Sequence, residues 1–388
     1  MRDSLNPWNC CKWKDDLDFR PRRSGLRLRI DSDVPSVIRE HCIHFAAWLR
    51  KKYEFPVRIP VYVKFKTLVR ASDGELVSGL FFEPYSRSVE PYAKVAVGVV
   101  DKLEDEYNTK NAICKILCSI AHELTHYFQW INCMEPMEPR ANSRIEWQAS
   151  YYGHKLSKMY SMKYIWTPVE QTILKMESYD ALHADDYQML QSWTETENSS
   201  VKRMIVALVA QREADEARKL LLQLSNDSNA SVRAFALDVL CGFPAPECIK
   251  RLQQAVHDER NTYARYCAIR SCADLMIDEA EDAHAVQTFF ETVMHKETEP
   301  LCRLGCSYAL YISGQDSALD AILSLLDSKD EDLQCETVIV LQDIAETKNI
   351  QAIAKSVKRL QKGNCSNSLS ECIRLFFQNV KPIFDKCR

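Results

Sequence analysis

The stretch "CSIAHELTHYFQW" (residues 118–130) places two histidines and a glutamate inside an apolar run with helical periodicity. His122 and His126 are four residues apart, so on a helix both imidazoles lie on the same face and can reach one ion. Glu123 projects beside them. In such an H-E-x-x-H arrangement the histidines bind zinc and the glutamate acts as general base. The stretch therefore predicts Zn²⁺ as cofactor, with His122 and His126 as ligands and Glu123 as the catalytic residue.

A third zinc ligand is available downstream of this helix. A catalytic zinc takes three protein ligands and keeps one position open. The segment "RIEWQASYYGHKL" (residues 144–156) places Glu146 near the start of the next predicted helix, after a loop long enough to reverse the chain. Glu135 and Glu138 in that loop are competitors for this role. Hydrolysis at such a centre also needs a hydrogen-bond donor for the developing oxyanion. His154, Tyr151 and Tyr152 are the candidates, and ordinary helix packing is the alternative role for each of them.

Strand and helix patterns alternate around the H-E-x-x-H stretch. The strand preceding the long helix, residues 93–100, is expected to hold an extended peptide along its free edge at Ala93, Val95 and Val97. The order of elements predicts a small α+β domain. Its strand-like segments are residues 25–30, 57–65, 76–82 and 93–100, and its helical segments are residues 35–52, 110–131 and 143–160.

H-E-x-x-H followed twenty residues later by "EWQA" (146–149) resembles the gluzincin class of zinc metallopeptidases. The order of strands and helices resembles most closely the ImmA/IrrE-type domain, over about residues 25–165. That resemblance implies a zincin-like fold, zinc bound by His122, His126 and Glu146, and cleavage of a regulatory or defence-related protein in the bacterial cytoplasm. The sequence has Gln148 where many members carry a second acidic residue, and Thr125 where many carry glycine.

Beyond about residue 169 the pattern is helical and repeats. The stretches "SSVKRMIVALVA", "ASVRAFALDVLC", "TYARYCAIRSCA", "PLCRLGCSYALY" and "EDLQCETVIVLQ" follow one another at steps of 31, 32, 38 and 31 residues. In each stretch as quoted, apolar or small residues recur at the third, seventh and eleventh positions, which lie on one helix face. The units resemble HEAT repeats. They predict an all-α solenoid whose extended surface binds a protein substrate or regulator.

Basic residues recur at one position of these repeats: Lys202, Arg233, Arg265 and Arg303. A row of cations is able to bind an acidic partner, but abundant Asp and Glu favour pairing with acids of the neighbouring repeat. His41 and His44 on the first helix have no third ligand nearby in the pattern, so we interpret them as a surface pair rather than a second metal site.

Composition limits the remaining choices. The 388 residues carry a net charge of −4 and only 9 glycines, which disfavours nucleic-acid binding and glycine-rich nucleotide loops. No stretch is long and apolar enough for a membrane span, and the first residues lack a secretory signal, which favours a cytoplasmic location. The expected domains are an N-terminal arm (1–22), a zincin-like metallopeptidase domain (23–165), a helical connector (166–198) and a HEAT-repeat domain (199–380).

Two other functions stay open from the sequence. In the first alternative, the zincin-like domain would bind zinc as a non-catalytic sensor or scaffold, and the HEAT repeats would bind a protein partner. In the second, it would hydrolyse a small amide, which requires a closed pocket. Zinc-dependent endopeptidase activity is the leading hypothesis, with the repeats selecting the substrate or holding the enzyme inactive.

Overall fold

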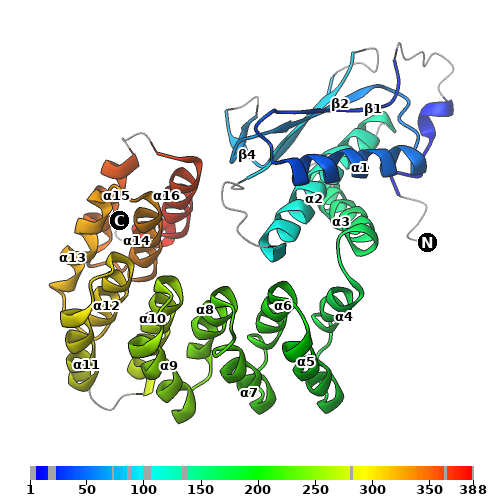
Figure 1. The fold of residues 1–388 in the computed structure, drawn as a ribbon. Helices are drawn as coiled ribbons and strands as arrows, with labels where there is room; N and C mark the ends of the chain where they lie inside the picture. Colours follow the sequence, from blue (N-terminus) through cyan, green and yellow to red (C-terminus); the bar gives the residue numbers. More distant parts are fainter. Residues whose placement is uncertain are drawn as a thin grey trace. The chain divides into compact units, whose positions relative to one another are not determined.

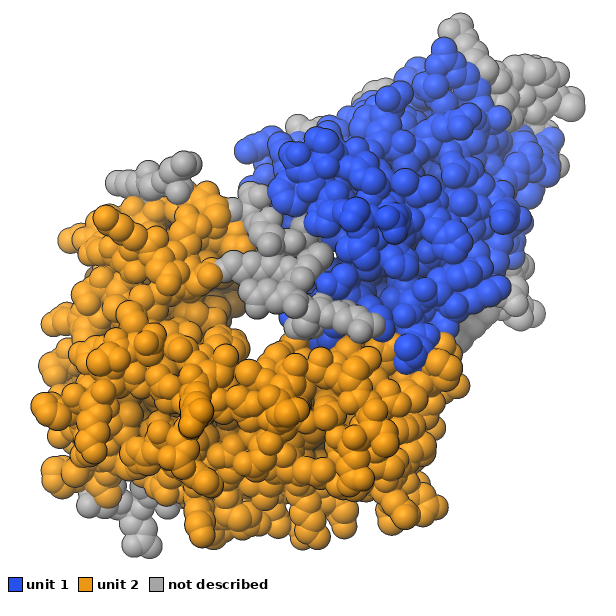
Figure 2. All heavy atoms as spheres, in the orientation of Figure 1, with its two compact units in different colours: residues 1–167 blue, residues 168–388 orange. Residues whose placement is uncertain are grey.

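The computed structural model of the chain describes residues 6–15, 23–71, 74–84, 89–98, 106–132, 139–279, 283–361 and 365–386. Its Cα positions form two compact units, Met1–Thr167 and Pro168–Arg388, which are coloured separately in Figure 2. The first unit contains a mixed sheet and helices, and the second is helical. The expected order of a region with a sheet and helices followed by a mostly helical region is therefore confirmed.

The first unit consists of a small sheet with helices α1, α2 and α3 on one side of it (Figure 1). Buried and half-buried side chains alternate along β2, which agrees with one face of the sheet packed on the helices. The elements, in chain order, are η2 (Lys12–Asp15), β1 (Leu26–Ile30), α1 (Ser36–Lys52), β2 (Ile59–Lys64), β3 (Val69–Arg70), β4 (Leu76–Val77), β5 (Gly79–Phe82), β6 (Tyr92–Ala96), α2 (Glu106–Ile131) and α3 (Pro139–Tyr164).

The main sheet has the strand order β1-β2-β6-β5. β6 is parallel to β2 on one side and antiparallel to β5 on the other. The prediction that Ala93, Val95 and Val97 form a free edge is therefore wrong, because β6 is an inner strand and these three side chains are buried. Strand β5 precedes β6 in the chain and pairs antiparallel with it, so β5 covers the edge of β6 that was expected to be free. Within the described residues, β5 is the strand at that side of the sheet.

The N-terminal segment packs firmly against the first unit. Trp8 is only 4% exposed and its ring lies against Tyr53 and Phe128, at centroid distances of 4.8 and 4.5 Å. The backbone N–H of Lys12 donates to Asn132 Oδ1 at 3.0 Å, just beyond the end of α2. The described part of the expected arm is thus a component of the core around α2.

The second unit is a double layer of helices. Figure 1 shows α6, α8 and α10 side by side, with α5, α7 and α9 forming the other layer. The helices are α4 (Pro168–Met176), α5 (Ala184–Thr196), α6 (Ser199–Val209), α7 (Asp215–Leu224), α8 (Ala230–Val239), α9 (Pro246–Asp258), α10 (Thr262–Glu279), α11 (Ala283–Lys296), α12 (Pro300–Ile312), α13 (Ala318–Ser324), α14 (Glu331–Asp343), α15 (Ile350–Gln361), α16 (Asn367–Asn379) and α17 (Lys381–Lys386), with short 3-10 helices η3 (Leu240–Gly242) and η4 (Leu325–Asp327).

The repeating core positions predicted from the sequence are confirmed. They fall on or at the end of α6, α8, α10, α12 and α14, and every one of them is buried. Side-chain caps begin several of these helices: Asn198 accepts from the N–H of Val201, and Asp330 accepts from that of Leu333. The buried positions are Val201, Ile205, Val209, Val232, Ala236, Leu240, Ala264, Ala268, Cys272, Cys302, Cys306, Leu310, Leu333, Thr337 and Leu341.

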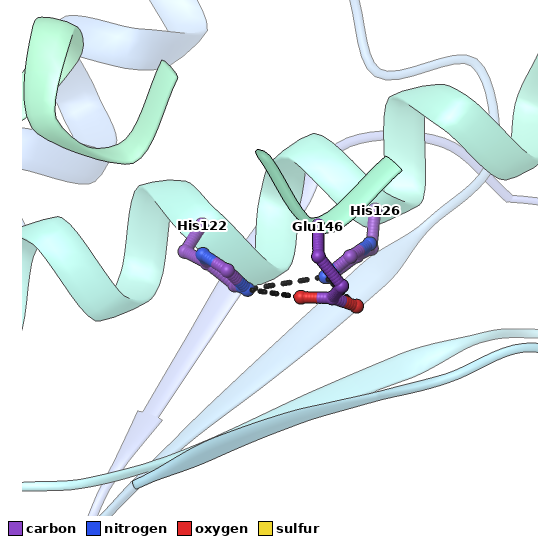
Figure 3. A group of neighbouring side chains, drawn as sticks. All are labelled: His122, His126 and Glu146. Atoms are coloured by element: carbon purple, nitrogen blue, oxygen red, sulfur yellow. Dashed lines mark hydrogen bonds and ion pairs between the residues drawn. The ribbon is translucent and has the colours of Figure 1, made fainter. Parts of the chain in front are cut away.

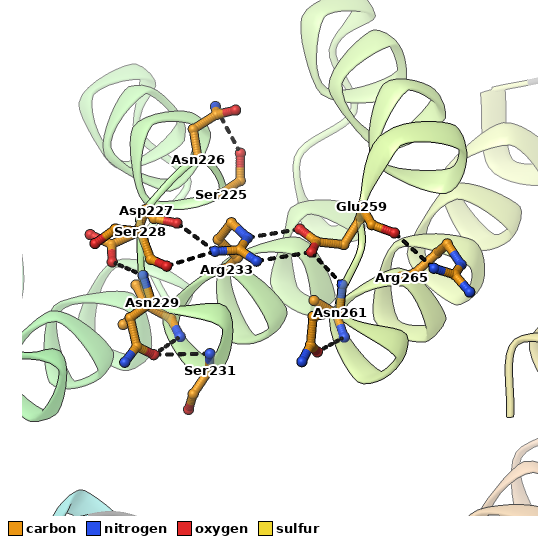
Figure 4. A network of polar contacts seen from close by, with 12 residues as sticks. Ser225, Asn226, Asp227, Ser228, Asn229, Ser231, Arg233, Glu259, Asn261 and Arg265 are labelled. Atoms are coloured by element: carbon orange, nitrogen blue, oxygen red, sulfur yellow. Dashed lines mark hydrogen bonds and ion pairs between the residues drawn. The ribbon is translucent and has the colours of Figure 1, made fainter. Parts of the chain in front are cut away.

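The recurring cations pair with acids in the loops between repeats (Figure 4). Glu259 illustrates the pattern: its carboxylate accepts from Arg233 at 2.7 and 2.9 Å and from the N–H of Asn261 at 2.8 Å. Its backbone carbonyl accepts from Arg265, in the following helix, at 2.8 Å. The same arrangement joins Lys202 to Asp227 and Arg265 to Glu297. The structural interpretation of these cations is confirmed for Lys202, Arg233 and Arg265, whereas Arg303 donates to the carbonyls of Met294 and Glu297.

Candidate metal centre

Helices α2 and α3 bring three ligand atoms together (Figure 3). The Nε2 atoms of His122 and His126 lie 3.1 Å apart. Glu146 reaches them from the first turns of α3, with its two carboxylate oxygens 3.5 Å from His122 Nε2 and 3.4 Å from His126 Nε2. The spacing of four residues on one helix and the reversal of the chain before α3 produce this convergence, as the sequence pattern predicts.

The three groups fit a zinc ion in chemistry and spacing. Zinc bonds of about 2.0–2.1 Å to nitrogen and oxygen, arranged tetrahedrally, place neighbouring donor atoms roughly 3.3 Å apart. The histidine nitrogens lie 3.1 Å apart, and each lies 3.5 or 3.4 Å from a different oxygen of Glu146. With one donor atom from each residue, all three lie within 4.8 Å of one another. Two imidazoles and a carboxylate are also one of the usual sets for a catalytic zinc with an open fourth position. Glu146 is 61% exposed at its side chain, which leaves the centre accessible from solvent.

Glu123 lies against strand β5 and lines the same cleft as the three ligands. Its side chain is 6% exposed. A Cβ atom added at Gly79, the first residue of β5, would lie only 2.4 Å from Glu123 Oε1. The missing side chain at Gly79 is therefore what gives this carboxylate its space beside the strand.

Burial and mutual contacts shift the pKa values of the cluster. Burial raises the pKa of Glu123 to about 7. Burial, followed by the charge of His126, lowers the pKa of His122 to about 4. Burial also acts to lower the pKa of His126, but contact with the Glu146 carboxylate and the charge of Glu123 outweigh it and raise this pKa. The hydrogen bond from His126 is the main cause that lowers the pKa of Glu146.

Two residues that the sequence interpretation missed support the ligands. Gln129 Oε1 lies 2.9 Å from His126 Nδ1, so the histidine is held at both of its nitrogens. Gly153 on α3 allows close packing against α2, since a Cβ there would meet the carbonyl oxygen of Cys118 at 3.1 Å and His122 Cβ at 3.3 Å. Both were detectable in principle: Gln129 follows His126 by three residues on the same face, and Gly153 follows Glu146 by two turns.

The centre opens into a cleft of about 610 Å³ between α2, the start of α3 and β5. Strand β5 contributes Gly79, Leu80 and Phe81 to its wall, and Trp130 of α2 also lines it. The Trp130 indole is fixed by a hydrogen bond from Nε1 to the Pro84 carbonyl at 3.1 Å. The cleft thus joins an apolar wall, a strand edge and the three ligands in one space.

The predicted oxyanion donors have other contacts, although the charge of His154 contributes to lowering the pKa of His122. Tyr152 belongs to the apolar core, and Tyr151 stacks on the exposed Trp147 at a centroid distance of 5.5 Å. His154 Nδ1 contacts Cys118 Sγ at 3.5 Å, one turn before His122. None of these three is among the described residues that line the cleft. An oxyanion role for these three residues therefore stays a prediction.

The other sequence hypotheses have mixed outcomes. Glu135 and Glu138, the competitors of Glu146, lie outside the described residues. His41 and His44 both face the Tyr160 hydroxyl, with Nδ1–Oη distances of 3.4 and 2.8 Å, and no metal-binding group of three includes them in the part of the chain that is described.

Comparison with known families identifies the repeats. A sequence model described as HEAT repeats matches residues 217–311, which run from α7 to the end of α12. No peptidase family is detected, and no curated protein matches the chain. No helix in the described segments has the length and apolar character needed to cross a bilayer. The match indicates a protein-binding role for the second unit.

Proposed function

We propose that the chain is a zinc-dependent endopeptidase of the zincin type, with its centre in the first unit and HEAT repeats that select or regulate its protein substrate. The observation that carries this proposal is the convergence of His122, His126 and Glu146 beside a buried Glu123. This is the arrangement expected of a gluzincin-like site built from an H-E-x-x-H helix and a downstream glutamate. Resemblance to the ImmA/IrrE-type domain suggests a regulatory or defence-related protein in the bacterial cytoplasm as substrate.

The chain's own residues supply the acid–base chemistry. Zinc held by the three ligands would act as a Lewis acid that polarises a water molecule and the scissile carbonyl. Glu123 would accept the proton of the attacking water and later donate it to the leaving amine. Its buried position next to Gly79 favours this role, because a carboxylate shielded from bulk water holds and transfers a proton near neutral pH.

Strand β5 takes over the substrate-binding role expected of β6. One edge of β5 pairs with β6 from Gly79 to Phe82. In the described residues no strand pairs with its other edge, and β5 lines the cleft. An extended peptide added along β5 would gain backbone hydrogen bonds and bring its scissile bond beside Glu123.

A non-catalytic function is the second candidate. The HEAT-repeat match favours protein binding, and no peptidase family is detected. Under this alternative the centre would bind zinc as a sensor or scaffold, and Glu123 would be dispensable. The two candidates agree on the ligands and differ in the role of Glu123.

The deciding experiment compares wild-type protein with His122→Ala and Glu123→Gln. Zinc content is measured by elemental analysis, and cleavage is measured on a proteome-derived peptide mixture and on proteins in cell lysate. The peptidase proposal expects one zinc per chain in wild type and Glu123→Gln, loss of zinc in His122→Ala, and cleavage by wild type alone. Zinc binding without cleavage, together with full partner binding by Glu123→Gln, would support the sensor instead. A folded wild-type chain without zinc would contradict both.

A further inference from the structure

Gln129 occupies a buried position from which it contacts three groups around the centre. Its side chain is 3% exposed. Its Oε1 lies 2.9 Å from His126 Nδ1, and its Nε2 donates to the Ile145 carbonyl at 3.0 Å and to Gln148 Oε1 at 2.9 Å. An amide with every close neighbour in hydrogen-bonding distance has little freedom to rotate or flip.

These contacts determine which end of the amide faces the histidine. The backbone carbonyl of Ile145 is able only to accept, so the Gln129 atom that faces it must be the N–H₂ group. The other end, Oε1, has no hydrogen and therefore accepts from His126 Nδ1. Nδ1 must then carry a proton, and Nε2 is the nitrogen of His126 whose lone pair is available. That nitrogen faces His122 and Glu146.

The same side chain connects the two helices that carry the ligands. His126 belongs to α2, whereas Ile145 immediately precedes Glu146 on α3. One amide therefore orients the imidazole of His126 and holds the backbone beside Glu146. Gln148 extends this connection one residue further along α3. Many members of the family that the first unit resembles have an acidic residue where this chain has Gln148. In this chain the neutral amide of Gln148 accepts from the Gln129 N–H₂ group.

We infer that Gln129 is a positioning residue for the metal centre: as a fixed acceptor it keeps the proton of His126 on Nδ1 and leaves Nε2 to bind the ion. The inference rests on the proposed zinc site. Groups that hydrogen-bond to the second nitrogen of a ligating histidine orient the ring and raise its basicity, and their loss costs roughly 10- to 100-fold in metal affinity. An acceptor is required for this role, whereas the donor side of the amide serves α2–α3 packing.

Two substitutions separate the acceptor from the donor. Gln129→Met removes both, with similar side-chain length. Gln129→Glu keeps an acceptor for Nδ1 and removes the N–H₂ that faces Ile145 and Gln148. Gln148→Met is the matched control, because it removes a polar partner of Gln129 and leaves the contact to His126 in place. All are made in the full chain.

The measurement is the zinc dissociation constant, by competition with a chromophoric chelator, with the melting temperature of metal-free protein recorded beside it. We expect Gln129→Met to weaken zinc binding by roughly 10- to 100-fold, and Gln129→Glu and Gln148→Met to stay close to wild type, since a carboxylate accepts the same N–H. Wild-type affinity in Gln129→Met, or an equal loss in Gln129→Met and Gln129→Glu, would overturn the inference. If Gln129→Met does not fold, a large loss in folded Gln129→Glu overturns it by itself, and wild-type affinity there supports it.

Failure of the underlying proposal is recognisable in the same series. A wild-type chain that binds no zinc defeats the metal site and the inference together. Tight zinc binding by wild type with no dependence on the acceptor at position 129 defeats the inference alone.

Discussion

The indole N–H of Trp8 donates to Thr125 Oγ1 at 2.9 Å, across 117 residues of sequence. Thr125 in turn donates to the Ala121 carbonyl at 2.7 Å, and it lies on α2 between His122 and His126. Thr125 within this H-E-x-x-H stretch thus has a structural partner in the N-terminal segment. A residue near the start of the chain therefore holds α2 within the H-E-x-x-H stretch itself.

Trp8→Ala should strongly destabilise the first unit. The ring is buried against Tyr53 and Phe128, and truncation of a buried aromatic residue costs about 3–5 kcal/mol. Trp8→Phe keeps most of the packing, and we expect it to lose much less, although Thr125 loses its donor. Urea unfolding followed by far-UV circular dichroism measures both. Equal stability of Trp8→Ala and wild type would mean that this segment does not dock in solution.

Gly79→Ala should impair catalysis while zinc stays bound. The new Cβ would come within 2.4 Å of Glu123 Oε1, so the carboxylate has to move, and the three atoms nearest to the new Cβ all belong to Glu123 rather than to a metal ligand. Displacement of a catalytic group by about 1 Å costs on the order of 100-fold in rate. Zinc content and peptide cleavage are measured on the same preparation.

Gly242→Ala is the matched control for Gly79→Ala, because a Cβ there meets nothing within 4 Å. We expect it to cleave peptide at the wild-type rate. Full activity in Gly79→Ala would show that the close approach of Glu123 to β5 has no bearing on its function.

Replacing Glu259 by Gln should destabilise the helical unit. The side chain of Glu259 is 6% exposed and pairs with Arg233 through two contacts. Removal of one partner of a largely buried ion pair costs about 3–5 kcal/mol, because the other charge is left uncompensated. Asp327→Asn is the control: Asp327 also makes two contacts, with Arg359, but both side chains are more than half exposed, and the expected loss is below about 1 kcal/mol. Comparable losses in the two variants, measured by urea unfolding, would contradict this assignment.

The contribution of Glu259 should disappear in acid. Its hydrogen bond with Arg233 lowers the pKa of this carboxyl below the ordinary value of about 4.3. A group with a lowered pKa in the folded state stabilises the protein above its unfolded pKa and loses this effect as pH falls through the folded pKa. The difference in unfolding free energy between wild type and Glu259→Gln should therefore be largest near neutral pH and shrink below about pH 4. A difference that stays constant over this range would exclude the charged pair as its cause.

Much of this architecture follows from local patterns. The third, seventh and eleventh positions of each quoted repeat stretch predict the buried face of five helices, because helical periodicity and apolar burial are properties of short segments. The separation of His122 and His126 by one turn predicts their convergence for the same reason. The prediction that Glu146 is the third ligand required one further assumption, namely that the chain reverses between α2 and α3.

The errors arise where the outcome depends on distant parts of the chain. Strand-like composition locates β5 and β6 but does not give their order in the sheet, so Ala93, Val95 and Val97 were assigned to an edge that β5 covers. The position of Trp8 depends on a contact 117 residues away. The role of Gln129 depends on the direction of its amide, which only the neighbouring Ile145 carbonyl determines.

The pairing scheme shared by Lys202, Arg233 and Arg265 makes the repeats that carry it interchangeable units. A segment such as residues 227–258 carries the acid that receives the preceding cation and the arginine that binds the following acid, Asp227 and Arg233. Duplication or deletion of that segment would join neighbours without leaving an orphan charge. The longer step of 38 residues between Ala264 and Cys302 leaves the Arg265–Glu297 contact intact. The number of repeats can therefore change by whole units, in evolution or by engineering, and adjust the reach of the binding surface independently of the N-terminal unit.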